Sequence, residues 1–176
     1  RRTNEIERVA KEIRDAGGEA IAVTTDVTKK EDVENLAASA GEHFGSLDIW
    51  VNNAGGSPIQ ANLVDLPEEE WHATLALNLT AVFYGVRAAA RHMDETGRIV
   101  ITSSVASQDI FEGSGHYSAC KAGVDMLTRT LSRELAPIRI NNILPGLVPT
   151  EVMMNALSIT DDDLPAVLEG SDIVAG

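Results

Sequence analysis

The chain has 176 residues, of which 44% are apolar and 23% charged, a composition typical of a globular chain of about one domain. Fourteen Lys and Arg residues against 27 Asp and Glu residues give a formal net charge of −13. Such a chain repels phosphate backbones and anionic lipid, which argues against nucleic-acid or membrane-surface binding. The single cysteine, Cys120, cannot form an internal disulfide, and this favours a reducing compartment such as the cytoplasm.

No membrane span or signal peptide is expected. No segment reaches the ~18 uninterrupted apolar residues that a span needs. The longest apolar-rich stretch, residues 80–90, contains Arg87 and predicts a buried helix. Residues 1–5 include neither a Met nor the start of an apolar signal-peptide core, and we expect this sequence to be a fragment of a longer protein.

The first elements alternate between helix and strand. Apolar residues with helical spacing over residues 6–16 predict an amphipathic helix that ends at a pair of glycines. The apolar run 20–24 then predicts a buried strand. A second amphipathic helix follows over residues 33–44, and Thr28 and Glu31 ahead of it have the spacing of a capping box.

The alternation continues through the middle of the chain. Residues 47–51 predict a strand. A helical region runs from residue 65 to about residue 93, with Pro67 and three glutamates at its start, where a helix favours proline and carboxylates. The run 99–102 predicts the next strand.

The last predicted elements are a long helix over residues 124–135, which stops at Pro137, and a strand over residues 138–144. The tail, residues 161–176, is acidic and predicts no element. Strict alternation of helices with continuous apolar strands is the pattern of a parallel sheet covered on both faces. Ligands bind such sheets at the carboxyl ends of the strands.

Small, polar or turn-forming residues follow every predicted strand. In chain order they are Asp26-Val27, Asn52-Asn53-Ala54-Gly55, Ser103-Ser104, and Pro145-Gly146 with Thr150 beyond. Taken singly, the serine pair is equally compatible with a helix cap or turn, and the asparagine segment with an ordinary turn. Gly113-Ser114-Gly115 has part of the pattern of a phosphate loop but follows no predicted strand, and we interpret it as a linker.

The most specific chemical feature is Tyr117 followed four residues later by Lys121. Four residues advance a helix by about 400°, so both side chains project from nearly the same face. A tyrosine ionises near pH 10, and a neighbouring ammonium favours the anion. Ser104, at a strand end, has a hydroxyl suited to polarising a carbonyl. The same tyrosine–lysine spacing also occurs between surface neighbours with no catalytic role.

Taken together, these motifs resemble those of the short-chain dehydrogenase/reductase family. The resemblance extends from residue 1 to about residue 157 and is carried by Asp26, Asn52-Asn53-Ala54-Gly55, Asn78, Ser104, Tyr117, Lys121 and Pro145-Gly146. It implies a doubly wound parallel sheet of the Rossmann type, with three α/β/α layers, here incomplete. It also implies an NAD(P)-dependent oxidoreductase that transfers a hydride between nicotinamide and a carbonyl or secondary alcohol.

The resemblance also implies a role for each matching residue. Tyr117 would be the general acid/base, Lys121 would lower its pKa and hold the nicotinamide ribose, Ser104 would orient the substrate oxygen, and Asn78 would support a water in the proton relay. Further cofactor contacts would come from Asp26, Val27, Asn53, Ala54, Gly55, Pro145, Gly146, Val148 and Thr150. His116 and Cys120 are given no role and are interpreted as packing residues. No metal site is predicted.

The sequence departs from the family pattern at its ends. No counterpart is found here for five elements of the family: its first strand, glycine-rich loop, first helix, second strand and final strand. We therefore expect apolar sheet edges to be exposed. We also expect this segment alone to fold poorly and to bind the cofactor weakly. The link at Ala136-Pro137 is shorter than usual. Arg1 falls where an arginine can pair with a 2′-phosphate, which favours NADP(H) over NAD(H).

These observations predict one partial NAD(P)-binding domain over residues 1–176, with residues 151–176 as a helical segment on the substrate side. The substrate pocket would involve residues 105–115, the stretch after Gly55 and residues 147–168, and its substrate would be a small carbonyl or alcohol compound. Family resemblance further implies a homotetramer or homodimer packed through the long helices, including residues 125–135. The alternative hypothesis is a non-catalytic binding or scaffold fragment of the same fold.

Overall fold

The centre of the molecule is a parallel three-stranded sheet. The computed structural model describes residues 3–57 and 59–146, and further along Val148, Met154, Thr160, Asp162, Asp163 and Pro165. The strand order is β1-β2-β3, with β1 at Ile49–Asn52, β2 at Arg98–Thr102 and β3 at Arg139–Ile143. Arg98 aligns with Ile49 on one side and with Arg139 on the other, so the strands end at a common edge. The predicted α/β class and three of the four predicted strands are confirmed.

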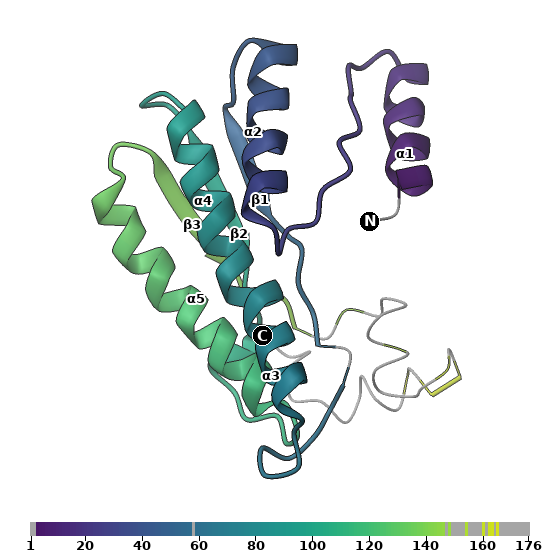
Figure 1. Ribbon diagram of the computed structural model, residues 1–176, viewed down its shortest axis with the longest axis vertical. Helices are drawn as coiled ribbons and strands as arrows, with labels where there is room; N and C mark the ends of the chain where they lie inside the picture. The colour runs from purple at the N-terminus through teal and green to yellow at the C-terminus, as the bar shows by residue number, and fades with distance from the viewer. Residues whose placement is uncertain are drawn as a thin grey trace.

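Helices cover one face of this sheet. Helices α4 (Ala81–His92) and α5 (Gly115–Glu134) pack against the strands, and α2 (Lys30–Phe44) packs against α4 (Figure 1). Side chains alternate between the two faces of a strand. Those that point toward the helices are buried and form the core with helix residues: Trp50, Ile99, Ile101 and Ile140 with Val33, Ala37, Val82, Val86 and Val124.

The opposite face differs from the expectation of a sheet covered on both sides. Ile49 is 64% exposed and Val51 55% exposed, and Ile143 at the end of β3 is also exposed. Among the described residues the sheet therefore has two layers, helices and strands, in place of three. The exposed Ile49 and Val51 belong to β1, an edge strand of the described sheet, where exposed apolar edges were expected.

The prediction of a strand over residues 20–24 is wrong. This segment is extended and half-buried but belongs to no sheet. It runs from α1 (Thr3–Asp15) back to α2. Figure 1 shows α1 and this segment apart from the strands. Its contacts are with α1: Arg14 donates to the carbonyl of Ala20, and the hydroxyls of Thr3 and Thr24 are hydrogen-bonded. Strand structure requires a main-chain partner, and no described strand lies beside this segment.

The predicted capping box at the start of α2 does not form. The residue before α2, Lys29, makes no side-chain cap bond. The hydroxyl and the amide of Thr28 both donate to the carboxylate of Asp26, at 2.7 and 3.1 Å. The carboxylate therefore takes the hydroxyl that the capping box would have used, and it closes a tight turn at residues 26–28 instead.

The helical region predicted from residue 65 is continuous from Glu68 to His92 but changes its winding. It consists of α3 (Glu68–Leu75), a π-helical turn η1 (Ala76–Thr80) and α4. By length and composition this run is able to cross a membrane. Six residues of α4 are buried against the sheet and its neighbours, so the segment is a core helix, as predicted for residues 80–90.

Candidate active site

The side chains of Ser104 and Tyr117 meet where the end of β2 faces the first turn of α5. Ser104 follows β2 closely and Tyr117 is the third residue of α5. The Ser104 hydroxyl lies close enough to the Tyr117 phenol to favour its ionised form. The same serine oxygen accepts from the amide of Ala106 at 3.1 Å and caps the short 3₁₀ turn η2 (Val105–Ser107). The cap and the contact with tyrosine, which the sequence left as alternatives, therefore occur together.

Lys121 lies one turn further along α5 and is 3% exposed. Its Nζ donates to the carbonyl oxygen of Thr102, the last residue of β2, at 2.8 Å, and it lies 5.4 Å from the centre of the Tyr117 ring. The interpretation of Tyr117 and Lys121 as mere surface neighbours is thereby excluded. The ammonium is buried inside the site, and the sheet determines its position.

Burial controls the ionisation of this pair. It raises the pKa of the Tyr117 phenol above its ordinary value, and the hydrogen bond from Ser104 acts in the opposite direction. Burial also lowers the pKa of Lys121, while Cys120 and Asp125 raise it. The net shift of the Tyr117 pKa is upward because desolvation of the phenol outweighs the effect of Ser104, and the expected lowering by Lys121 stays a prediction.

Asn78 connects the helical run to the turn that follows β1. It lies in the π-helical turn η1 and its side chain is fully buried. Its Oδ1 accepts from the amide of Gly56 at 2.9 Å, and its Nδ2 donates to the carbonyls of Gly56 and Thr74 at 2.9 and 3.0 Å. The side chain thus satisfies three backbone groups and holds the 54–56 turn against the helix.

Comparison with known proteins establishes the family. The sequence matches the family described as short chain dehydrogenase over residues 1–160. The chain belongs to the short-chain dehydrogenase family. It is 41% identical over 165 residues to 3beta-hydroxysteroid dehydrogenase 1 of Eggerthella lenta, covering 89% of this chain and 61% of that protein. It is 38% identical over 144 residues to glucose 1-dehydrogenase 2 of Bacillus subtilis, covering 79% and 56%.

The fold comparison agrees. A solved short-chain dehydrogenase from Burkholderia cenocepacia in complex with NADP is similar with a TM-score of 0.80 and 37% identity, covering 86% of this chain and 63% of that one. The chain therefore spans about three fifths of the length of these members of the short-chain dehydrogenase family. The Rossmann-type class expected from the motifs is confirmed by these relatives.

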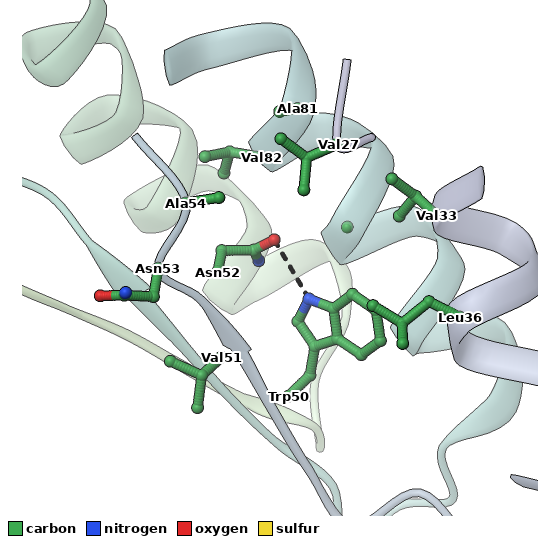
Figure 2. Close-up of a pocket in the computed structure, with 11 residues that line it drawn as sticks. Val27, Val33, Leu36, Trp50, Val51, Asn52, Asn53, Ala54, Ala81 and Val82 are labelled. Atoms are coloured by element: carbon green, nitrogen blue, oxygen red, sulfur yellow. Dashed lines mark hydrogen bonds between the residues drawn. The ribbon is translucent and has the colours of Figure 1, made fainter. Parts of the chain in front are cut away.

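Four of the residues predicted to contact the cofactor of this short-chain dehydrogenase, Asp26, Val27, Asn53 and Ala54, line two cavities beside β1. Asp26, Val27 and Ala54 line an open cleft of about 440 Å³ together with small residues of α3 and η1. A smaller cavity of about 70 Å³ adjoins it and is lined by Val27, Asn53 and Ala54. Figure 2 shows this cavity, with the amide of Asn52 directed at the indole nitrogen of Trp50 on the same strand, a contact of 3.1 Å.

The turn at Gly55 provides a test of whether a dinucleotide fits here. A Cβ at Gly55 would lie 2.9 Å from Oδ1 of Asn78 and 3.3 Å from Nζ of Lys121. Only glycine therefore leaves the space between the turn and these two side chains open. Ala54 lines the cleft directly before Gly55, and the buried Lys121 ammonium lies across Gly55, which suits a ligand with a flat ring and ribose hydroxyls. The residues present fit a nicotinamide dinucleotide.

The other predicted cofactor residues are only partly placed. Pro145 lies beside the active-site turn, since its carbonyl accepts from the amide of Val105 at 3.1 Å. Gly146 and Val148 are exposed near the same strand end. Arg1, Thr150 and most of residues 147–176 lie outside the described residues. Asn53 is positioned by a hydrogen bond to its Oδ1 from the hydroxyl of Thr102, at 3.0 Å.

The burial of Cys120 and His116 agrees with their interpretation as packing residues, and the segment interpreted as a linker leads directly into α5, which begins at Gly115. Cys120 and His116 are both buried, and Ser114 is the N-cap position of α5. Nε2 of His116 is 2.9 Å from the hydroxyl of Ser57. Among the described residues, no cluster of three or more His, Cys, Asp or Glu side chains is able to hold a metal ion.

Sequence reasoning missed three positioning groups. They are the carbonyl of Thr102 that holds Lys121, the backbone of Gly56 that holds Asn78, and the buried carboxylate of Asp125. Main-chain partners leave no signature in the residue types. Asp125 had one available signal, because it lies four residues after Lys121 on a face that the apolar pattern marks as buried.

Proposed function

We propose that this protein is an NAD(P)-dependent oxidoreductase that transfers a hydride between nicotinamide and a carbonyl or secondary alcohol, with Tyr117 as the general acid/base. Membership of the short-chain dehydrogenase family supports this. The single most informative observation is that the buried Lys121 lies 5.4 Å from the centre of the Tyr117 ring, with the Ser104 hydroxyl beside the phenol. A hydroxyl, a phenol and an ammonium converge there on one small volume, as transfer of a proton to a substrate oxygen requires.

In this mechanism each side chain has one task. Ser104 donates a hydrogen bond to the substrate oxygen, which polarises the carbonyl. Tyr117 gives its phenolic proton to that oxygen during reduction and takes it back during oxidation. Its raised pKa keeps the phenol protonated at neutral pH, which is the form that reduction needs. The bound nicotinamide supplies or accepts the hydride.

The remaining residues position the reactants. Lys121, fixed by the carbonyl of Thr102, would bind ribose hydroxyls and stabilise the phenolate that forms when Tyr117 loses its proton. Asp26, Val27 and the 53–55 turn would hold the adenosine portion. Asn78 would support a water in the proton relay in addition to holding Gly56.

Replacement of Tyr117 by Phe tests the mechanism. The variant lacks the transferable proton but keeps the ring, so turnover should fall by at least about 10²-fold while the affinity for NADPH stays within about twofold. The probes are D-glucose with NAD(P)⁺ and a 3-oxosteroid with NAD(P)H, suggested by the relatives, in the protein as the cell produces it. Tyr84→Phe is the matched control. Retained activity of the Tyr117 variant would contradict the mechanism.

We also propose NADP(H) as the preferred cofactor, because Arg1 provides a guanidinium at a position suited to a 2′-phosphate. Turnover with NADPH at least several-fold faster than with NADH is expected. A clear preference for NADH would overturn this assignment. The buried free thiol of Cys120 fits a reducing, cytoplasmic setting.

Assembly through the long helices is a further part of the proposal. Met126 on α5, within the residues that the family resemblance implies for an interface, is an exposed apolar residue, and so is Phe83 on α4. We expect a homodimer or homotetramer in light scattering, and a monomer at micromolar concentration would contradict it. The alternative, a non-catalytic scaffold, is disfavoured because Ser104, Tyr117 and the buried Lys121 are all present and lie together.

A further inference from the structure

A buried carboxylate on α5 joins this helix to both neighbouring strands. Asp125 is 8% exposed. Its Oδ1 accepts from the hydroxyl of Ser103 at 2.5 Å and from the amide nitrogen of Asn142 at 2.6 Å. Ser103 directly follows β2, and Asn142 lies in β3. A carboxylate is expensive to bury unless its oxygens accept hydrogen bonds, so these two donors determine where this part of the helix lies.

These contacts are adjacent to the reacting groups in sequence and in space. Ser103 precedes Ser104, and Asp125 lies one turn beyond Lys121 and two turns beyond Tyr117 on α5. The bond from Ser103 to Asp125 therefore connects the strand end that carries one reacting hydroxyl to the helix that carries the other. A shift of α5 along β2 would break this bond before it changed any contact within the helix itself.

Asp125 also supplies a negative charge close to Lys121. Burial opposes the ammonium form of Lys121, whereas Cys120 and the carboxylate of Asp125, one helical turn away on α5, favour it. Both groups lie on α5, as does the Tyr117 ring. The groups that face the ammonium from other elements are neutral: the carbonyl of Thr102 on β2 and, across the space at Gly55, the amide of Asn78 on η1.

We propose that Asp125 is a positioning residue for the Ser104–Tyr117–Lys121 site, holding α5 against the ends of β2 and β3 through Ser103 and Asn142 and acting as the counter-charge of the Lys121 ammonium. The proposal rests on the function proposed above. It assigns Asp125 no contact with substrate or cofactor.

Two substitutions separate the hydrogen bonds from the charge. Asp125→Asn keeps an oxygen that can accept from Ser103 and Asn142 but removes the charge. Asp125→Ala removes both. Thr128→Val is the matched control, because Thr128 is buried one turn further along the same helix face and bonds only to the carbonyl of Val124 in its own helix. If Asp125 had only a structural role, the three variants would have the same Lys121 titration and the same kcat when compared at equal stability.

The first measurement does not depend on turnover. In protein labelled with ¹⁵N-lysine, NMR titration of Nζ should place the ionisation of Lys121 about one pH unit lower in Asp125→Asn than in wild type. The Thr128→Val titration should match wild type. An unchanged Lys121 titration in Asp125→Asn would overturn the counter-charge role.

The second measurement is steady-state reduction of the 3-oxosteroid probe in the protein as the cell produces it. Asp125→Ala should lower kcat at least about tenfold with the KM for NADPH within about twofold, since displaced reacting groups slow the chemical step more than cofactor binding. Asp125→Asn should keep most of kcat at neutral pH. As the pH is raised, however, its kcat should begin to fall at a lower pH than that of the wild type. Wild-type kcat in folded Asp125→Ala would overturn the positioning role, whereas an inactive wild type would overturn the proposed function and leave the NMR titration to decide on Asp125.

Discussion

Removing the side chain of Asn78 should destabilise the protein and loosen the turn at residues 54–56. The amide makes three hydrogen bonds to backbone groups of Gly56 and Thr74, and it is fully buried. Asn78→Leu keeps the side-chain volume but leaves these groups without their partner. At about 1 kcal/mol for each lost bond, the free energy of unfolding should fall by about 3 kcal/mol.

A comparison of two substitutions separates the polar contribution from packing. Asn78→Ala removes the same hydrogen bonds and also leaves a cavity, which should cost about 1 kcal/mol more than Asn78→Leu. Urea unfolding followed by tryptophan fluorescence gives both values, with Asn62→Ala as a control at an exposed asparagine. If both variants at position 78 stayed within about 1 kcal/mol of wild type, the three hydrogen bonds would not stabilise the turn as described.

Two further substitutions test the packing and the ionisation of buried groups. A Cβ at Gly85 would lie within 3 Å of the buried Asn52 side chain, so Gly85→Ala should lower the free energy of unfolding by about 1–3 kcal/mol, whereas Gly41→Ala, in an uncrowded helical position, should raise it or leave it unchanged. Burial lowers the pKa of His116 below 6.5, so its contribution to stability is present above pH 6.5 and is lost as pH falls through the lowered pKa. The free energy of unfolding should therefore decrease on acidification below pH 6.5, and less so in His116→Gln, which can still bond to Ser57; equal pH dependence in the two proteins would contradict this.

The catalytic constellation could be predicted from the sequence because its geometry is local or nearly so. Tyr117 and Lys121 are separated by one helical turn, and Ser104 follows a strand that its apolar run makes easy to recognise. The pKa of Tyr117 could not be predicted in the same way. Its direction depends on how much of the phenol is desolvated, which is a property of the packed site rather than of residue spacing.

The errors have a common physical origin in long-range partners. The run 20–24 has the composition of a strand but lies beside α1, with no described strand to pair with. The Thr28 hydroxyl donates to the carboxylate of Asp26 instead of capping the amide of Glu31. The π-helical turn at Asn78 has no pattern of apolar residues that distinguishes it from an α-helix. In each case a partner chosen by tertiary structure determines the outcome.

The anchoring of Lys121 by a main-chain oxygen has an evolutionary consequence. Because the acceptor is the carbonyl of Thr102, no substitution of the residue-102 side chain can delete it. That side chain is left to serve a different purpose, the hydrogen bond to Asn53. Drift at position 102 should therefore alter the neighbouring turn while the lysine keeps its place, so that one residue can vary in identity without the loss of its most important contact.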